Sequence, residues 1–404
     1  MMPDQSELNP VGPGDFYGFA DRLTDAEKAA LRRLRTFLRE RAEPILAEHW
    51  ESATPPAFLR HEFAAGDFVN PWELREAGEE VRPLFVGFRN LELSRTDSSL
   101  AILIGGQIGM FNGVMRMGLT PEQYSSVQAD IESFRMTGCF ALTEPEHGSD
   151  IAGGLSTSAQ PAGDGWVLNG QKRWIGNAAY SQYALVPAKD SSTGELRVFL
   201  VRTDAPGVRI EKIQGKTAVR MVHNAHIFLD DVEVSEAERL PRISSFEELG
   251  SAFRTLRPDV VWNAVGLQAG AYEHTLAYVK RRQQFGRPIG SFQLVQEKLV
   301  RMLGNVTASL GMAVQLAELA EQQGGADGAV SHAQAALGKS WVCARMRETA
   351  AWGRELLGGD GVLLENDLAR FHADAEALYT FEGTHEINSL IVGREITGHS
   401  AFRG

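Results

Sequence analysis

The hydrophobic periodicity of this 404-residue chain changes twice, and this limits its fold more than any other feature. Up to about residue 136, apolar residues recur at helical spacing. Between residues 138 and 240 they alternate as in half-buried strands, and from about residue 246 helical spacing returns. Helices, strands and helices in this order, without strand–helix alternation, argue against a doubly wound parallel sheet. We therefore expect a helical domain at 1–137, a β domain at 138–240 and a helical domain at 241–404.

Local signals define individual elements. Thr24 and Glu27 form a capping box, which marks a helix start. The almost continuously apolar segment 94–117 predicts a helix buried on most sides. Asn169-Gly170, between apolar residues, predicts a two-residue hairpin turn. The other expected elements are a helix from Pro121, strands at 183–188, 197–202, 208–213 and 226–234, a loop at 322–329 and a long helix at 333–357.

Composition and charge narrow the class of protein. The formal net charge is −12 with no long basic run, so nucleic acid and an anionic membrane are poor partners. Cys139 and Cys343 stand in apolar contexts, which predicts buried thiols in a reducing compartment. The N-terminus resembles neither a signal peptide nor a transit peptide, and no apolar run approaches the length of a bilayer span. We expect a cytoplasmic protein.

Several common motifs are missing from the sequence. It lacks the glycine pattern of a Rossmann dinucleotide site, a P-loop and the Gly-x-Ser-x-Gly turn of acyl-transfer enzymes. His223 and His226 lie three residues apart, but on a strand this spacing points the side chains to opposite faces. We interpret both histidines as structural and predict no metal site.

The most informative candidate for chemistry is Glu382, which stands between Phe381 and Gly383 before an apolar helical stretch. A carboxylate beside a large apolar ring loses water, so its pKa and its strength as a base should rise. Gly383 would let the backbone approach a ligand closely. Thr384 can equally cap a helix here, which would make Glu382 an ordinary solvated acid. Both interpretations fit this segment alone.

Four further segments combine glycines with polar or aromatic residues. The turn at 148–150 offers backbone N–H groups and a hydroxyl to an anion, and Trp174 stands beside a Gly-Asn step. Arginines around Phe285 could hold a phosphate while glutamines read polar ring edges. Gly358 and Gly359 allow close backbone approach. Each segment also has an ordinary explanation, as a turn, a core tryptophan, a basic helix end or a helix C-cap.

Taken in order, patterns in five regions resemble the acyl-CoA dehydrogenase family from about residue 24 to the end. They are Leu-Thr-Glu-Pro-x-x-Gly-Ser-Asp at 142–150, Lys-x-Trp-Ile at 172–175, Arg-x-x-Phe-Gly with Phe-Gln at 282–293, Leu-Gly-Gly-x-Gly at 357–361 and Glu-Gly-Thr at 382–384. The glutaryl-CoA dehydrogenase and plant short-chain acyl-CoA oxidase branches look the most similar. Segments 170–177 and 353–359 look more like the oxidase.

The resemblance implies an α+β multidomain fold: an N-terminal helical domain, a middle antiparallel β-barrel and a C-terminal four-helix bundle. It implies a homotetramer built as a dimer of dimers, with FAD bound between the middle and C-terminal domains and partly by a neighbouring subunit. The substrate would be an acyl-CoA, and the electron acceptor an electron-transfer flavoprotein.

The family's site residues are implied position by position. Glu382 would remove the α-proton of the acyl thioester while the β-hydride passes to the flavin, and its backbone N–H would help to polarise the thioester carbonyl. The implied FAD contacts are Thr143, Ser149, Trp174 and Ile175 at the flavin, Arg282, Phe285 and Gln293 on the FAD of a partner subunit, and further Gly358, Gly359, Thr384 and Glu386. The implied substrate contacts are Ser149, Arg257 near the thioester, Phe381, Gly383 and Ala101.

Departures from the family pattern bear on the substrate. In the glutaryl branch, an arginine four residues after the Asp of an Arg-x-Asp motif binds the distal carboxylate; here the motif ends at Asp97 and leads to Ala101. A carboxylate tail would stay unpaired in an apolar pocket, which is costly. Phe381 also replaces that branch's tyrosine. We therefore predict a neutral, short- or medium-chain acyl group.

Two other departures bear on the reaction. Gly176 replaces a serine or threonine that reaches flavin N5 in many dehydrogenases, which keeps an oxidase using O2 open. Asp360 stands where the family has asparagine, and a carboxylate fits badly beside FAD phosphates. The remaining alternatives are a glutaryl-CoA dehydrogenase-like decarboxylating enzyme, a non-catalytic acyl-thioester or FAD-binding protein, and an acyl carrier protein as the carrier of the substrate.

Overall fold

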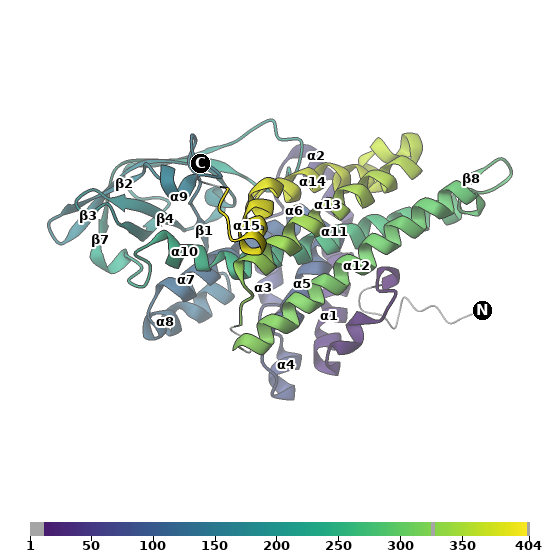
Figure 1. The fold of residues 1–404 in the computed structure, drawn as a ribbon, viewed down its shortest axis with the longest axis horizontal. Coiled ribbons are helices and arrows are strands. Elements are labelled where there is room, and N and C mark those ends of the chain that lie inside the picture. The colour runs from purple at the N-terminus through teal and green to yellow at the C-terminus, as the bar shows by residue number, and fades with distance from the viewer. Residues whose placement is uncertain (1–11, 325–327, 402–404) are drawn as a thin grey trace.

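The computed structural model describes residues 12–324 and 328–401, in which helices are followed by a curled sheet and then by helices again (Figure 1). This order confirms the prediction from hydrophobic periodicity. The helices before the sheet are α1 (Asp25–Phe37), α2 (Leu46–Ser52), α3 (Phe58–Ala65), α4 (Trp72–Ala77), α5 (Pro83–Thr96), α6 (Ser98–Gly105), α7 (Asn112–Gly118) and α8 (Pro121–Glu132). The strands of the sheet, with one short helix, are β1 (Gly138–Phe140), α9 (Ile151–Gly154), β2 (Ser158–Ala162), β3 (Gly165–Ile175), β4 (Tyr183–Asp190), β5 (Leu196–Arg202), β6 (Val208–Lys212) and β7 (Ala225–Ser235).

The last part of the chain is a bundle of long helices. Its elements are α10 (Phe246–Ser251), α11 (Phe253–Arg281), β8 (Gln283–Gln284), β9 (Arg287–Pro288), α12 (Gln293–Gly324), α13 (His332–Leu356), α14 (Leu368–Thr380) and α15 (His385–Thr397). The β8–β9 ribbon joins α11 to α12 at the end of the molecule farthest from the sheet (Figure 1). The loop predicted at 322–329 starts later than expected, because α12 continues to Gly324; residues 325–327 lie outside the described residues, and 328–331 lead into α13.

Helix starts follow the capping signals of the sequence. Thr24 Oγ1 accepts a hydrogen bond from the Glu27 N–H, and the Glu27 carboxylate accepts one from the Thr24 N–H, so the predicted capping box is present at α1. The predicted helix from Pro121 is α8. Because these contacts are local in sequence, they were predictable without any knowledge of packing.

The apolar segment predicted at 94–117 is divided by Asp97, whose Oδ1 accepts a hydrogen bond from the Leu100 N–H at 3.1 Å and so starts α6. From there α6, a π-helical turn (η6, Gly106–Phe111) and α7 run without a break. This helix, Ser98–Gly118, has 21 residues and a mean hydropathy of 1.3, enough to cross a membrane, so the expectation that no run approaches this length was wrong. Since 56% of its apolar window is buried within the protein, and core helices pass the same test, the helix says little about a membrane.

The seven strands form a mixed sheet in the order β1, β4, β2, β3, β7, β6, with β5 paired to β4. β1 and β2 run parallel to β4, while the other pairs are antiparallel. The expectation of a purely antiparallel middle domain is therefore corrected. A parallel pair of strands needs a long connection. The chain from β1 to β4 passes through α9, β2 and β3, and the chain from β2 to β4 passes through β3, so both parallel pairs have one.

The predicted hairpin at Asn169-Gly170 is wrong, because β3 runs straight through both residues. Its register against β7 shifts between Leu168 and Gly170, so the Asn-Gly step is a β-bulge. The Asn169 side chain holds the bulge by accepting from the Asp231 N–H at 2.9 Å and donating to the Asp231 carboxylate at 2.9 Å. Gly170 has φ 152°, and a Cβ there would lie 2.6 Å from Thr157 Oγ1.

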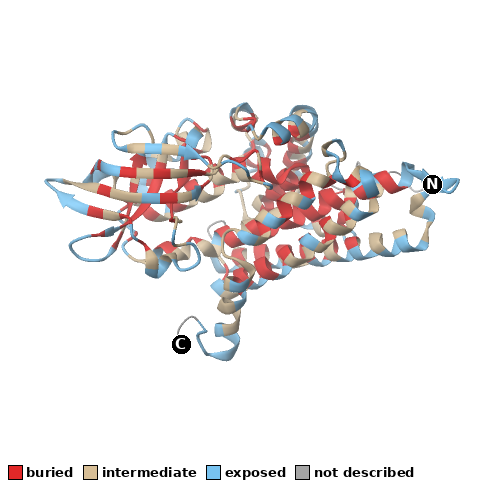
Figure 2. Ribbon diagram, turned by 90° about the horizontal axis from the view of Figure 1, so that it is seen from above, coloured by how far each residue is buried: buried red, intermediate tan, exposed pale blue. Residues whose placement is uncertain are grey.

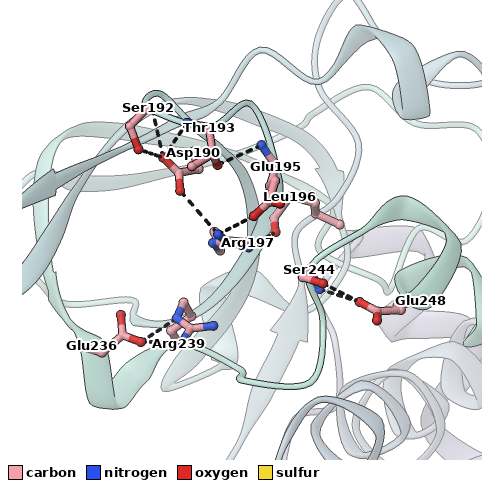
Figure 3. A network of polar contacts seen from close by, with 10 residues as sticks. All are labelled: Asp190, Ser192, Thr193, Glu195, Leu196, Arg197, Glu236, Arg239, Ser244 and Glu248. Atoms are coloured by element: carbon pink, nitrogen blue, oxygen red, sulfur yellow. Dashed lines mark hydrogen bonds and ion pairs between the residues drawn. The ribbon is translucent and has the colours of Figure 1, made fainter.

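A polar network fixes the turn between β4 and β5 (Figure 3). The buried Asp190 carboxylate accepts from the Ser192 N–H at 2.9 Å and from its hydroxyl at 2.6 Å, and it lies 3.5 Å from Arg197 Nη2. An aspartate that binds backbone N–H groups of its own turn replaces a backbone turn bond. These charged residues are therefore structural.

One hydrophobic core joins the two helical parts of the chain (Figure 2). Phe85 and Phe88 of α5 are buried in the same cluster as Trp262 of α11 and Leu310 of α12. The sheet has a separate cluster of its own, which includes Phe199. The boundaries predicted at 137/138 and 240/241 stay predictions; β1 starts at Gly138 and α10 at Phe246.

The histidine pair and the cysteines have structural surroundings. His223 Nε2 lies 3.1 Å from the Ala53 carbonyl, and His226 stacks on Phe228. In the part of the chain that the structure describes, no group of three or more His, Cys, Asp or Glu residues could hold a metal ion. Cys139 and Cys343 are buried, as expected, and burial raises the pKa of their thiols to about 12 and about 11.

Candidate active site

A cavity of about 2240 Å³ is lined by residues from all three parts of the chain. Pockets for drug-sized ligands have volumes of roughly 300–1,000 Å³. This cavity therefore has room for more than one small molecule. The sequence-predicted site residues that line it are Ala101, Thr143, Ser149, Trp174, Ile175, Arg257, Phe381, Glu382, Gly383 and Thr384.

Glu382 lies in the short turn between α14 and α15 and lines the cavity. Thr384 does cap α15, accepting from the Ile387 N–H at 3.3 Å, but Glu382 precedes this cap and is not a solvated acid. The backbone of Glu382 is left-handed at φ 53°, and Gly383 follows at φ 95°. A left-handed non-glycine residue costs about 1–3 kcal/mol, so the surrounding structure must hold it.

Two side chains hold this turn through the Gly383 carbonyl. Lys339 Nζ, on α13, donates to it at 2.7 Å and to the Tyr379 carbonyl at 2.8 Å. Asn388 Nδ2, on α15, donates to it at 2.8 Å. Three helices thereby fix the peptide that follows Glu382. Among the described residues, no group accepts a hydrogen bond from the Glu382 N–H, which leaves that donor free for a ligand.

The Glu382 carboxylate is kept out of water. Its Oε2 atom is buried and has no hydrogen-bond partner. Burial raises the pKa of Glu382 to about 8, repulsion from Asp259 adds to the rise, and Lys339 and Arg257 oppose it. A carboxylate with a pKa near neutrality is matched to taking a proton from a weak acid.

Arg257, on α11, is the nearby cation without full pairing. The side chain is buried, and its Nε and Nη1 atoms have no hydrogen-bond partner. Burial lowers the pKa of the guanidinium, while Glu382 opposes this shift. Two buried groups of opposite charge with unused hydrogen-bonding atoms indicate a site that binds a polar ligand.

The opposite wall comes from the sheet. Trp174 is 51% exposed, lines the cavity and has a left-handed backbone at φ 66°. Its carbonyl accepts from Asn224 Nδ2 at 3.1 Å, and the Thr143 carbonyl accepts from the Arg173 N–H at 2.8 Å. These bonds hold Thr143, Trp174 and Ile175 along one surface beside Gly176.

A buried ion pair lies directly behind this wall. Lys172 Nζ donates to Glu144 Oε1 at 2.9 Å, and the Glu144 carboxylate also accepts from the N–H groups and hydroxyls of Ser156 and Thr157. Burial alone would raise the pKa of Glu144, but Lys172 and these donors lower it to about 2. Every oxygen of this carboxylate is satisfied, so the pair is structural and fixes Thr143 next to it.

Other predicted contacts do not line the cavity. Arg282, Phe285, Gln293, Gly358, Gly359 and Glu386 are all exposed. The β8–β9 ribbon, which carries Phe285 at 93% exposure, lies at the end of the molecule opposite the sheet (Figure 1). One chain therefore does not bring these residues together with Trp174.

Asp360 has a partner within the chain. Its Oδ2 accepts from the Tyr278 hydroxyl at 2.6 Å. The carboxylate that replaces the usual asparagine is thus bound within the helical bundle. This contact explains how an acid is tolerated at this position.

The sequence interpretation missed three residues of the site. Lys339 and Asn388 hold the Glu382 turn, and Asp259 lines the cavity two residues after Arg257. Lys339 stands in the largely apolar stretch 335–342. This was a usable signal of a buried polar contact, because a lysine is almost never buried without a partner. Nothing in the sequence alone pointed to Asn388.

Comparison with known proteins gives consistent matches. Family models described as "Acyl-CoA dehydrogenase, middle domain" and "Acyl-CoA dehydrogenase, C-terminal domain" match residues 139–232 and 246–397. The probable acyl-CoA dehydrogenase YngJ of Bacillus subtilis (strain 168) is 32% identical over 282 residues, covering 69% of this chain and 73% of that protein. Human mitochondrial short-chain specific acyl-CoA dehydrogenase is 28% identical over 384 residues, covering 92% and 90%. A crystal structure of a glutaryl-CoA dehydrogenase from Mycobacterium smegmatis in complex with FADH2 is 30% identical with a TM-score of 0.88, covering 98% of this chain and 100% of that one.

Proposed function

Because this chain belongs to the acyl-CoA dehydrogenase family, we propose that it is an FAD-dependent oxidoreductase that converts an acyl-CoA to the 2,3-enoyl-CoA. The observation that carries the proposal is Glu382, an unpartnered carboxylate on the wall of a large cavity, with a pKa raised to about 8. The Mycobacterium smegmatis relative at 30% identity is a complex with FADH2, which supports FAD as the cofactor.

The residues of the sheet wall fit a flavin. Trp174 is half exposed toward the cavity, and a Cβ at Gly176 would touch only Val222 and Asn224, at 3.5 and 3.8 Å, so a planar ring has space here. Thr143, Trp174 and Ile175 would hold it. FAD supplies the hydride acceptor of the reaction.

The chain's own groups supply the proton chemistry. The Glu382 carboxylate takes the α-proton of the acyl thioester. The backbone N–H of Glu382, which has no acceptor among the described residues, would donate to the thioester carbonyl oxygen as negative charge develops there. Lys339 holds the turn so that this donor and this base keep their relative positions. Water is excluded around Oε2, which strengthens both interactions.

The substrate tail is proposed to be uncharged and short or medium in length. Ala101, on α6, lies in an apolar cluster with Leu100 and Ile104 and lines the cavity. No cation stands at this position to pair with a distal carboxylate, so a glutaryl group would lose water without compensation there.

The exposed end of the bundle supports an assembly. Phe285 and Leu294 are 93% and 80% exposed, an unusual degree for large apolar side chains. We extend the proposal to a homotetramer, a dimer of dimers, in which Arg282, Phe285 and Gln293 of one subunit contact the FAD of another. Gly358, Gly359, Thr384 and Glu386 would make further FAD contacts. Electron-transfer flavoprotein as the acceptor and a cytoplasmic location belong to the same proposal.

Anaerobic titration of the purified yellow protein tests the function. Straight, branched and dicarboxylic acyl-CoAs are added in turn, and bleaching of the flavin absorbance is followed. Short- and medium-chain monocarboxylic acyl-CoAs are expected to bleach the flavin, and glutaryl-CoA much less. A protein that purifies colourless and does not take up FAD would contradict the proposal. Bleaching best with glutaryl-CoA would contradict the interpretation of Ala101.

An oxidase that uses O2 is the second candidate, and Gly176 is the observation that favours it. No hydroxyl at this position reaches toward a flavin, although a Cβ here would make only ordinary contacts with Val222 and Asn224. Hydrogen peroxide formation in air, without an added acceptor, would identify the oxidase. In that case Gly176→Ser should lower peroxide formation, because a Cβ at this position makes only ordinary contacts with Val222 and Asn224 and restores the hydroxyl that many dehydrogenases carry here.

A further inference from the structure

One titratable group in the cavity has no part in the proposed reaction. Asp259, on α11, lines the cavity two residues after Arg257. Asp259 and Glu382 both line the cavity, and repulsion from Asp259 contributes to the raised pKa of Glu382. The wall that should contact the acyl tail is otherwise apolar, with Ala101, Ile102 and Ile108.

Asp259 is arranged by residues from two other elements. Its Oδ1 accepts a hydrogen bond from Asn90 Nδ2 on α5 at 3.0 Å. A Cβ at Gly109 on η6 would lie 3.0 Å from Oδ2, closer than an ordinary contact, so the glycine keeps a side chain from crowding this oxygen. In the described ranges 12–324 and 328–401, no residue donates to Asp259 Oδ2 or to the Asn90 side-chain oxygen. Two acceptors thus face the cavity without a donor.

The surrounding charges are balanced. Asp259 and Glu382 are acidic, while Arg257 and the buried Arg89 beside Asn90 are basic. Burial raises the pKa of Asp259 to about 7, and Arg89 and Asn90 oppose the rise. With two acids and two guanidiniums, neither a carboxylate tail nor an ammonium tail gains a net attraction that would offset its loss of water. A neutral group that donates a hydrogen bond fits both the charges and the free acceptors.

Building on the proposed function, we infer that Asp259 and Asn90 form a recognition site for an acyl-CoA whose short tail carries a hydroxyl group. The hydroxyl donates to Asp259 Oδ2, which has no other donor among the described residues, and remains chemically unchanged. Recognition of this kind disfavours a substrate that lacks the hydroxyl, because an apolar tail would cover Asp259 Oδ2 and leave this oxygen without a donor.

Paired substrates test the inference. Anaerobic flavin reduction is measured with butyryl-CoA against ω-hydroxybutyryl-CoA and with hexanoyl-CoA against ω-hydroxyhexanoyl-CoA, with succinyl-CoA and ω-aminobutyryl-CoA as charged tails. The wild-type protein should favour at least one hydroxylated member over its partner by about tenfold or more in kcat/KM. Asp259→Val should bring this ratio to near one or reverse it, and Asp259→Asn should keep part of the preference. Asp204→Asn, at the exposed pair with Arg202, is the matched control.

The outcomes separate this inference from the proposed function. Flavin reduction by unsubstituted acyl-CoAs without any gain from a hydroxyl, and unchanged by Asp259→Val, would overturn the inference and leave the function intact. A preference for the succinyl or the amino tail would also overturn it. If no thioester reduced the flavin, both would be overturned. Should Asp259→Val not retain FAD, Asn90→Leu gives a second route to the same loss of preference.

Discussion

Glu144 and Glu382 each have a lysine nearby and carboxylate oxygens kept from water, yet their properties are opposite. Glu144, behind the sheet wall, pairs with Lys172 and accepts four further hydrogen bonds, which lower its pKa to about 2. Glu382 also has a lysine and an arginine near it, yet its Oε2 has no partner and its pKa rises to about 8. Both charge and hydrogen bonding separate them, because Lys172 and four donors bind the Glu144 carboxylate directly, whereas the Glu382 carboxylate is repelled by Asp259 and accepts from no donor among the described residues. Lys339 donates to backbone carbonyls beside Glu382 and leaves the carboxylate itself unpaired.

The comparison shows how one chain makes one carboxylate inert and another reactive. A fully bonded carboxylate is held in its ionised form and has no tendency to take a proton. A carboxylate that is buried without donors binds a proton readily and can act as a base. Changes at these two sites should therefore affect different properties of the protein.

The largest expected effect follows from Glu382→Gln. Glutamine keeps the size of the side chain but cannot take the α-proton, so flavin reduction by acyl-CoA should slow by about two to four powers of ten. FAD binding and the native fold should persist, because no satisfied hydrogen bond is lost. Stopped-flow absorbance gives the rate, and Glu365→Gln, an exposed acid after α13, is the control. Reduction at the wild-type rate would remove Glu382 from the chemistry.

Lys172→Met tests the structural role of the ion pair between Lys172 and Glu144. The substitution leaves Glu144 ionised and buried without its cation, which should cost about 3 to 5 kcal/mol of unfolding free energy. Chemical denaturation measures the cost, and the exposed Lys189→Met should change stability by less than about 0.5 kcal/mol. If Lys172→Met kept its stability, the description of this pair as structural would be wrong.

Much of the fold, but less of the site, could be predicted from the sequence. The capping box at Thr24 and the order of helices and strands depend on local patterns, and both were predicted. Asn169-Gly170 was misread because a bulge uses the same residues as a hairpin turn, and only the pairing with β7 decides between them. Lys339 and Asp259 were missed because each acts through residues more than 40 positions away or on another helix. Such contacts exist only after the bundle has packed.

A smaller effect is expected for Lys339→Met, which removes the ammonium group that donates to the backbone carbonyls on either side of Glu382. The Tyr379 and Gly383 carbonyls would lose a buried hydrogen bond, and the left-handed Glu382 turn would lose one of its two supports. Flavin reduction at neutral pH should fall by about tenfold, and part of the loss should return at higher pH because the Glu382 pKa rises further without this cation. An equal loss at every pH would indicate a purely structural role for Lys339.

The smallest expected effect is a displacement of the pH profile. Glu382 must be ionised to act, so kcat/KM should rise with pH through about 8 in the wild-type protein. Asp259, with a pKa of about 7, is ionised by then and repels Glu382. Asp259→Asn removes this repulsion, so the profile should move to lower pH, while Asp204→Asn should leave it in place.

Stability provides an independent measure of the same carboxylate. Because the pKa of Glu382 is higher in the folded than in the unfolded protein, its protonated form favours folding at low pH, and this stability is lost as pH rises through about 8. Glu382→Gln should remove that loss, so the Tm of the variant should gain on that of the wild type as pH rises toward about 8 and keep a constant advantage above this pH. Glu144→Gln should act in the opposite direction at neutral pH, because the bonded Glu144 is stabilised in its ionised form. If both variants changed Tm with the same sign, the contrast between an unpaired and a fully bonded carboxylate would not hold.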